Sequence, residues 1–280
     1  MVLPAILLAA TFLLYPIANT FWMSVHRVDE FGRMQGFAGL DNYRKLIADS
    51  AFQGSLQRTI TWTVATVAIT TVISLFLAVV LNERFKGRAF VRSLLMLPWA
   101  ASLVVTTLMW RWMAHPDFGA LNHLLAWSGI TSARIDWLAN SNLSFPLMIW
   151  IAVWVSIPAT TLMLLAGLQS IPTDVYEAAA LDGARGWHTF LDMTLPLLRP
   201  IFAVSILLNV IFVFNSFPII WVMTQGGPAG ATDTLVTYLY KLGFTFYQLG
   251  EAAAVSVIIF FILIIFALVH TRLMWKDVLK

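Results

Sequence analysis

Six apolar stretches of roughly 20 residues each constrain this 280-residue chain more than any other feature. They cover residues 2–25, 58–82, 93–114, 145–170, 200–223 and 250–270. A helix needs about 20 apolar residues to cross the hydrocarbon core of a bilayer, and an isolated strand cannot satisfy its backbone there. We therefore predict an all-α integral membrane protein, with six transmembrane helices in a single domain covering residues 1–280.

Composition supports this class and argues against several others. The chain is 60% hydrophobic and 11% charged, whereas soluble domains carry about 25% charged residues. The net charge of +3 is small and the basic residues are scattered, which argues against a nucleic-acid partner. The chain has no cysteine and its histidines are scattered, so we predict neither a disulfide nor a metal site.

The N-terminal stretch is predicted to be a transmembrane helix rather than a signal peptide. It has no basic start, and its apolar run exceeds the roughly 7–15 residues of a signal peptide. The missing basic residues at Met1 would fit a chain trimmed from a longer one. The loop at residues 26–57 is expected to hold one short helix, capped by Asp41 or Asn42 and running through Tyr43 and Leu46.

The positions of charged residues predict which loops are cytoplasmic, and the prolines predict where spans are interrupted. The densest basic patch, residues 83–92, follows the second stretch, and short Lys/Arg-rich loops stay cytoplasmic. Six spans then place both termini and residues 171–199 on the cytoplasmic side. Arg111 is interpreted as an interfacial residue rather than a buried functional charge. Pro98 and Pro158 are expected to interrupt the third and fourth spans.

Residues 171–199 form the polar connection of greatest functional interest. Glu177-Ala178-Ala179 opens a helix-forming run, Gly183 follows four residues after Ala179, and Leu195-Pro196 comes near its end. We predict a helix–turn–helix outside the membrane in which Gly183 takes a left-handed conformation at the corner. Leu195-Pro196 is expected to end the second short helix, and the fifth span to begin at Pro200.

This arrangement resembles the EAA loop of permease subunits of ATP-binding-cassette (ABC) importers. The Phe37–Tyr43 segment and Gly226-Gly227-Pro228 resemble elements of the carbohydrate branch of that family, similar to permeases of the maltose-transporter type. The resemblance extends from about residue 15 to residue 272. It implies a six-helix permease fold with a cytoplasmic coupling helix, in a bacterial or archaeal cytoplasmic membrane.

The resemblance also implies partners and coupling residues. The expected partners are a second homologous permease, two ATPase subunits, an external substrate-binding protein, a sugar and membrane lipid. ATP and Mg would bind to the ATPase, so no cofactor is expected on this chain. Glu177 would pair with a basic group of the ATPase while apolar side chains, Trp187 among them, enter a groove. The residues expected to couple to the ATPase are Glu177, Ala178, Ala179, Leu181, Asp182, Gly183, Leu195 and Pro196.

A polar face of the fifth span is the candidate solute path. Asn209, Val213 and Ser216 fall on one helix face, and Asn215 points away from it. This face could hold a helix–helix hydrogen bond or could line the path. In the fourth span, Ser156 and Thr160 lie one turn apart. The resemblance implies that six residues approach the solute: Val155, Ser156, Ala159, Asn209, Val213 and Ser216.

The chain carries no phosphate-binding G-x-x-x-x-G-K-[ST] sequence and no catalytic set within its spans, so we predict a non-enzymatic subunit. The function that the resemblance implies is ATP-driven import of a sugar or related polyol by alternating access. Two alternatives are a permease for a non-sugar solute and an ion-coupled secondary transporter. The absence of Asp and Glu from spans two to five argues against the second alternative.

Overall fold

The computed structural model describes residues 6–8, 10–181, 183–184 and 186–275. The chain forms two compact units. The first, here the hairpin unit, comprises Met1–Thr59 and Gln225–Phe266. The second, the bundle unit, comprises Ile60–Thr224 and Ala267–Lys280. Helices α4 (Ser50–Asn82) and α14 (Leu249–Trp275) contribute residues to both.

Long apolar helices dominate the described residues, as predicted. The segments long and apolar enough to cross a membrane are Ile6–Ser24, Ser50–Asn82, Ser141–Ser170, Trp187–Thr224 and Leu249–Met274. A sixth candidate is the bent pair α5 (Arg88–Ala100) and α6 (Leu103–Met113), whose axes differ by 93°. These segments follow the six apolar stretches in order, which confirms the mostly helical membrane fold. The second begins at Ser50 rather than at residue 58.

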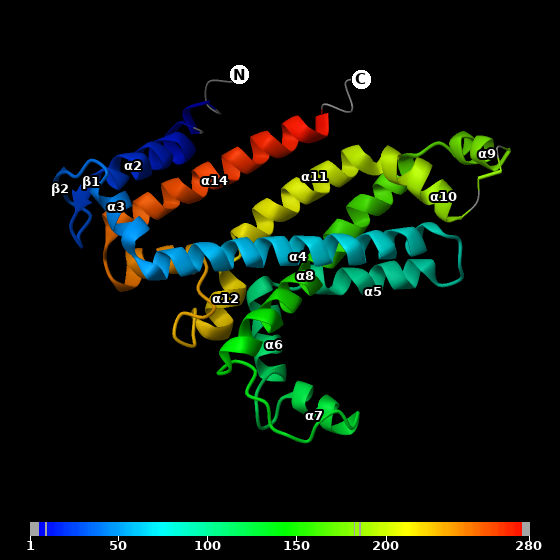
Figure 1. Ribbon diagram of the computed structural model, residues 1–280, viewed down its shortest axis with the longest axis horizontal. Helices are drawn as coiled ribbons and strands as arrows, with labels where there is room; N and C mark the ends of the chain where they lie inside the picture. The colour runs from blue at the N-terminus through cyan, green and yellow to red at the C-terminus, as the bar shows by residue number, and fades with distance from the viewer. Residues whose placement is uncertain (1–5, 9, 182, 185, 276–280) are drawn as a thin grey trace. The chain divides into compact units, whose positions relative to one another are not determined.

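The hairpin unit contains a small sheet that the sequence did not predict. After η1 (Ala10–Leu14) and α2 (Tyr15–Ser24), strands β1 (His26–Val28) and β2 (Met34–Phe37) pair antiparallel, with His26 opposite Phe37 (Figure 1). Helix α3 (Asp41–Ala48) follows and is the short helix that was predicted. The N-cap of this helix is Leu40, without a side-chain hydrogen bond, so the expected Asp41 or Asn42 cap was wrong.

Asn42 ties α3 to the end of α2 instead. Its buried amide nitrogen donates to the backbone oxygens of Ser24 at 2.8 Å and of His26 at 3.0 Å. A Cβ on Gly250 would lie 2.9 Å from the His26 oxygen, so a glycine is needed where α14 begins. The Phe37–Tyr43 segment therefore has a structural role in packing this unit.

A partly buried ion pair holds the turn that contains Gly226-Gly227-Pro228. Lys241 Nζ donates to both carboxylate oxygens of Asp233, at 2.9 and 2.7 Å, and Arg58 Nε donates to the Asp233 backbone oxygen at 2.7 Å. Gly226 has a φ of +85°, and a Cβ there would collide with Asp233. The segment then continues as α13 (Leu235–Tyr240) and η3 (Lys241–Thr245), so the turn is a rigid element.

The bundle unit is built around α8 (Ser141–Ser170) and α11 (Leu195–Phe214). A Cβ on Gly167 would lie 2.9 Å from Ile201 Cγ2 and 3.0 Å from Leu198 Cδ2, so the two helices approach closely there. A core cluster includes Trp62, whose indole nitrogen donates to the Val213 oxygen at 2.9 Å. The shorter elements of the unit are α7 (Ala120–Trp127), α9 (Thr173–Leu181), α10 (Trp187–Thr189), η2 (Phe190–Thr194) and α12 (Phe217–Thr224).

Neither proline interrupts its span where the sequence predicted. Helix α8 continues through Pro158, because neighbouring groups can satisfy the backbone that a proline frees in a membrane helix. In the third span, α5 includes Pro98, and the break falls at Ala101 and Ser102, which are extended. Arg111, in the last turn of α6, donates to the Val222 backbone oxygen at 3.0 Å and so ties α6 to α12.

The polar connection at residues 171–199 turns where predicted but ends differently. Helix α9 stops at Leu181, and Gly183 has a φ of +81°, in the left-handed region. Leu195-Pro196 does not end a helix, because α10, η2 and α11 run on without a break. The wide π-helical turns of η2, directly before Pro196, provide a way to accommodate a residue that has no backbone N–H.

Candidate functional site

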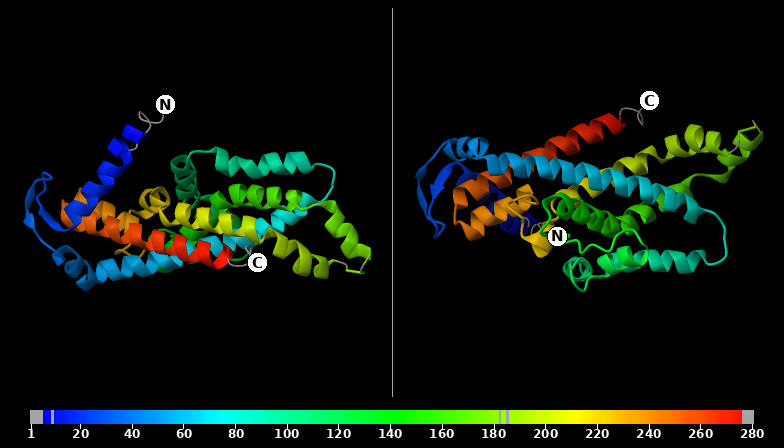
Figure 2. Two further views of the ribbon diagram at one scale, coloured as in Figure 1. Left: turned by 90° about the horizontal axis from the view of Figure 1, so that it is seen from above. Right: turned by 60° about the horizontal axis from the view of Figure 1, so that its bottom comes forward.

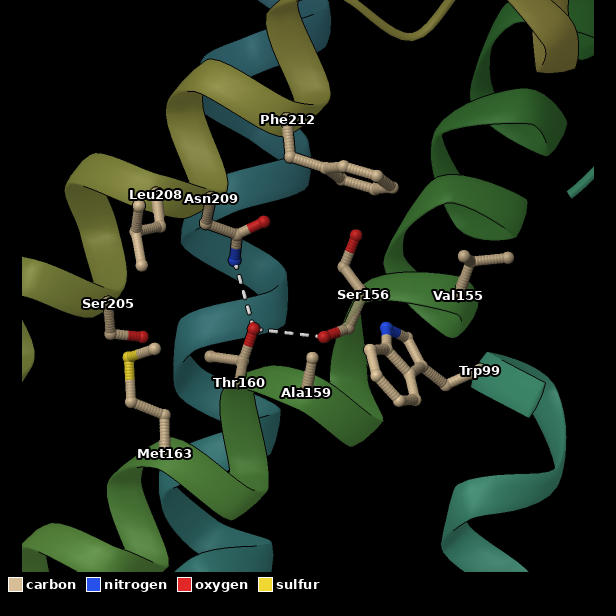
Figure 3. Close-up of a pocket in the computed structure, with 10 residues that line it drawn as sticks. All are labelled: Trp99, Val155, Ser156, Ala159, Thr160, Met163, Ser205, Leu208, Asn209 and Phe212. Carbon is tan, nitrogen blue, oxygen red and sulfur yellow. Dashed lines mark hydrogen bonds between the residues drawn. The ribbon is translucent and has the colours of Figure 1, made fainter. Parts of the chain in front are cut away.

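A cavity of about 190 Å³ opens among α5, α8 and α11 in the bundle unit. Figure 3 shows its lining side chains. None of them is charged, and most are apolar. They are Trp99, Val155, Ser156, Ala159, Thr160, Met163, Ser205, Leu208, Asn209 and Phe212.

A hydrogen-bond chain joins α8 to α11 at this pocket. The Asn209 amide nitrogen donates to Thr160 Oγ1 at 3.2 Å, and Thr160 Oγ1 donates to the Ser156 backbone oxygen at 2.9 Å (Figure 3). A helix–helix hydrogen bond, one of the two interpretations of this face that the sequence allowed, is therefore present. The same residues also line the pocket, so the two interpretations of this face are compatible.

Ser156 contributes a polar group that has no partner. Its hydroxyl is buried and forms no hydrogen bond with any residue that the structure describes. Leaving a buried hydroxyl unpaired costs roughly 1–3 kcal/mol. In Figure 3 the Ser156 hydroxyl and the Asn209 side-chain oxygen lie on the side of the pocket where Phe212 lies. A solute with hydroxyl groups could pair with both.

The structure brings together four of the six residues predicted to line the path. Val155, Ser156, Ala159 and Asn209 surround the pocket, but Val213 and Ser216 are not among its lining residues. Val213 belongs to the same core cluster as Trp62, whose indole nitrogen donates to the Val213 backbone oxygen. Ser216 is buried in the short break between α11 and α12. On α11 the pocket therefore includes Asn209 but, contrary to the sequence prediction, does not extend to Val213 and Ser216.

Trp99 is the main pocket residue that the sequence analysis missed. It lies near the end of α5, which packs against α8, just before the 93° bend between α5 and α6. No sequence signal identified it, because the packing of α5 against α8 is a tertiary contact. Ser205, Met163, Leu208 and Phe212 were also missed.

The loop at residues 171–199 projects from one end of the bundle unit in both views of Figure 2. Leu181 is 90% exposed, and Trp187, which stacks on Phe190 at 5.5 Å, is 67% exposed. Glu177 and Ala178 are also exposed. The loop thus presents two large apolar side chains to solvent, next to an acidic one.

The other predicted coupling residues have different surroundings. Ala179 is 2% exposed, so its side chain is not available to a groove on another protein, contrary to the expectation. Leu195 is half-buried and Pro196 exposed on the continuous helix. Tyr176 Oη and Thr194 Oγ1, 3.2 Å apart, join the two arms of the loop. Asp182 lies outside the described residues.

The described residues contain no group of three His, Asp or Glu side chains that could hold a metal ion. Comparison with known proteins identifies the family instead. The family model described as "Binding-protein-dependent transport system inner membrane component" matches residues 70–274, which include the pocket and the loop. The chain belongs to this family. It is a transport permease of the inner membrane, and its Glu177–Gly183 segment is the EAA element that is typical of such permeases.

Individual relatives are similar over nearly the whole chain. A probable ABC transporter permease of Brucella suis is 45% identical, over 98% of this chain and 94% of the relative. The trehalose/maltose transport system permease of Thermococcus litoralis is 35% identical, over 97% and 91%. A bacterial ABC transporter that imports the acidic polysaccharide alginate has the same fold, with a TM-score of 0.86, 23% identity, and coverage of 99% of this chain and 94% of that one. The chain is therefore an ABC importer permease.

Proposed function

We propose that this permease imports a neutral sugar or a related polyol. The observation that carries the proposal is the uncharged pocket in which the free Ser156 hydroxyl and the Asn209 amide face a common space. Hydroxyl groups of a sugar both donate and accept hydrogen bonds, as these two side chains do. The Trp99 and Phe212 rings provide apolar surfaces for the C–H faces of a sugar ring.

The absence of charge from the pocket lining favours a neutral solute over an acidic one. The relatives include both kinds, since one carries trehalose and maltose and another imports an acidic polysaccharide. Moving a carboxylate or phosphate out of water is costly unless it is paired. No Lys or Arg lines this pocket, so an anion would find no counter-charge among the lining residues.

The pocket is small enough to be one part of a larger site. Its volume of about 190 Å³ is below the range of about 300–1,000 Å³ that is usual for small-molecule sites. A second, homologous permease would complete it. In this arrangement the present chain acts as one permease domain and supplies the Asn209 side of the solute path.

Energy would come from two ATPase subunits, which bind ATP and Mg and dock on the loop at residues 171–199. The exposed Leu181 and Trp187 side chains would enter a groove of the ATPase, and Glu177 would pair with a basic group beside it. This role places the loop and both termini in the cytoplasm, and a substrate-binding protein delivers the solute on the other side. ATP binding and hydrolysis would then open the pocket alternately to the outside and to the cytoplasm.

Uptake by the complete transporter tests this function. The complex of both permeases and two ATPase subunits is reconstituted in proteoliposomes with its binding protein. ATP-dependent uptake of labelled trehalose, maltose or another neutral sugar is expected, and uptake of a sugar phosphate or an alginate oligosaccharide is not. Preferential uptake of the anionic solutes would overturn the assignment. Collapse of the ion gradient should leave uptake unchanged, which separates this function from ion-coupled transport.

A further inference from the structure

Two arginines of α5, one helical turn apart, converge on one residue at the end of α8. When the Gln169 amide presents its oxygen to them, this oxygen accepts hydrogen bonds from Arg88 Nη2 at 2.6 Å and from Arg92 Nη2 at 2.8 Å. Among the described residues neither arginine forms an ion pair, and both Nε atoms are buried without an acceptor. A single neutral amide therefore links two half-buried arginines of α5 to α8.

Gln169 lies at the root of the loop proposed to couple to the ATPase. It comes two residues before the loop begins at Ile171, and α9 starts at Thr173. Gly167, two residues earlier, is wedged against α11. Gln169 therefore lies between the turn of α8 that is packed against α11 and the start of the loop, where a displacement of the loop would act on it.

Helix α5 is packed differently at its two ends. Leu95 contacts the cluster of buried leucines on α4, α8 and α11, near the arginines. No residue along α5 is fully buried, but beyond Leu95 the helix borders a largely apolar cavity of about 580 Å³, which lies inside the bend between α5 and α6, against Trp154. Trp99 lies on this loosely packed end, about 10 Å along the helix axis from Arg92 at 1.5 Å per residue.

The bend beside Trp99 is suited to act as a hinge. Ala101 and Ser102 are extended and join two helices that differ by 93°. On the far side of the bend, Arg111 ties α6 to α12. One partner of the bent pair is thus anchored on α12 and the other on Gln169, with open space between them.

We propose that Arg88, Arg92 and Gln169 form a clamp through which movement of the coupling loop reaches Trp99 and reshapes the solute pocket. The inference rests on the proposed function. A helix held at one end and hinged at the other transmits displacement as a rigid body, which is a physical basis for coupling between distant sites. The three clamp residues act as positioning residues, since none of them lines the pocket.

The first test measures ATP hydrolysed per solute transported by the complete transporter in proteoliposomes. Gln169→Leu removes the acceptor and is expected to raise this ratio about tenfold, which corresponds to about 1.4 kcal/mol of lost coupling. Gln169→Glu keeps an acceptor and should retain the wild-type ratio. Arg84→Gln is the matched control, because Arg84 is an exposed arginine in the preceding turn. An unchanged ratio in Gln169→Leu would overturn the clamp.

The second test follows the movement itself. Because the chain has no cysteine, Trp99→Cys and Met163→Cys each place one thiol in the pocket, on α5 and α8 respectively. Maleimide labelling of both should change when the complex binds ATP. In the Gln169→Leu background the change should vanish at Trp99→Cys and persist at Met163→Cys. Persistence at both positions, or loss at both, would contradict transmission through α5.

A second set of variants and the uptake assay separate failure of the clamp from failure of the proposed function. Should Gln169→Leu fail to assemble, the double substitution Arg88→Gln and Arg92→Gln removes the donors instead and carries the same expectations. A wild-type complex that takes up no neutral sugar would contradict the proposed function. A wild-type complex that takes up sugar, with clamp variants that couple normally, would contradict only the clamp.

Discussion

The Asn209 side chain on α11 donates a hydrogen bond to the Thr160 hydroxyl on α8, at 3.2 Å. These two helices are also the ones that enter and leave the loop at residues 171–199. The pocket and the loop therefore share the same pair of helices. A relative movement of α8 and α11 would strain this hydrogen bond, so the two helices provide a physical connection between the two proposed sites.

Loss of the Asn209 amide should impair uptake. Asn209→Leu removes both the bond to Thr160 and a polar group of the pocket. We expect uptake of a neutral sugar to fall about fivefold, because one hydrogen bond contributes about 1 kcal/mol. The matched control is Asn215→Leu, since Asn215 is exposed and bonds only its own helix, at the Ile211 oxygen, among the described residues. Equal effects of the two substitutions in the uptake assay would contradict the pocket assignment.

Ser156→Ala should separate binding from stability. The Ser156 hydroxyl is buried without a partner, so removing it should leave the thermal unfolding temperature unchanged or raise it. If a solute hydroxyl normally pairs with this group, the KM for uptake should rise severalfold at the same time. Thermal unfolding in detergent and uptake kinetics measure the two effects. A lower unfolding temperature with an unchanged KM would assign Ser156 a purely structural role.

Tyr238 should make stability fall at alkaline pH. Its hydroxyl donates to Asp49 Oδ2 at 2.6 Å, and burial, followed by this carboxylate, raises the pKa of Tyr238 above its ordinary value. Because the folded pKa exceeds the unfolded value of about 10, the contribution is complete below about pH 10 and is lost as the pH rises beyond it. Unfolding temperatures measured from about pH 8 to pH 11 should fall less steeply for Tyr238→Phe. Parallel curves would refute this role.

Gly226→Ala and Gly87→Ala should differ although both glycines have a positive φ. An alanine in this conformation costs roughly 1–2 kcal/mol at either position. At Gly226 the new Cβ would also collide with Asp233, which Lys241 holds in place, whereas at Gly87 no atom lies within 4 Å. We expect Gly226→Ala to lower the folded yield strongly and Gly87→Ala only mildly, as judged by gel filtration in detergent. Similar yields would mean that the turn relaxes freely.

Much of the fold could be predicted because its main signal is local. A run of about 20 apolar residues specifies a membrane helix without knowledge of its neighbours, and a glycine after a helix-forming run marks a corner, as at Gly183. The β1–β2 hairpin was missed because strands of three and four residues carry no usable periodicity. The role of Asn42 was missed because its partners, Ser24 and His26, are tertiary contacts.

The pocket was only partly predictable for a related reason. Ser156, Ala159 and Asn209 were placed by helical spacing and family resemblance, and the structure brings them together. Trp99 lines the same pocket because α5 packs against α8, and this tertiary contact cannot be read from the sequence of α5. Gln169 was missed as well, since its partners Arg88 and Arg92 had been interpreted as signals of topology.

The exposed apolar residues of the loop allow one direct test of the central claim, that this loop docks on the ATPase. In a chain without cysteines, Leu181→Cys and Trp127→Cys each introduce one thiol at a highly exposed position, in the loop and in α7 respectively. In the complete transporter, a short bifunctional thiol reagent should link Leu181→Cys to a cysteine introduced into the ATPase groove, and should not link Trp127→Cys. A cross-link from Trp127→Cys with none from Leu181→Cys would contradict the account.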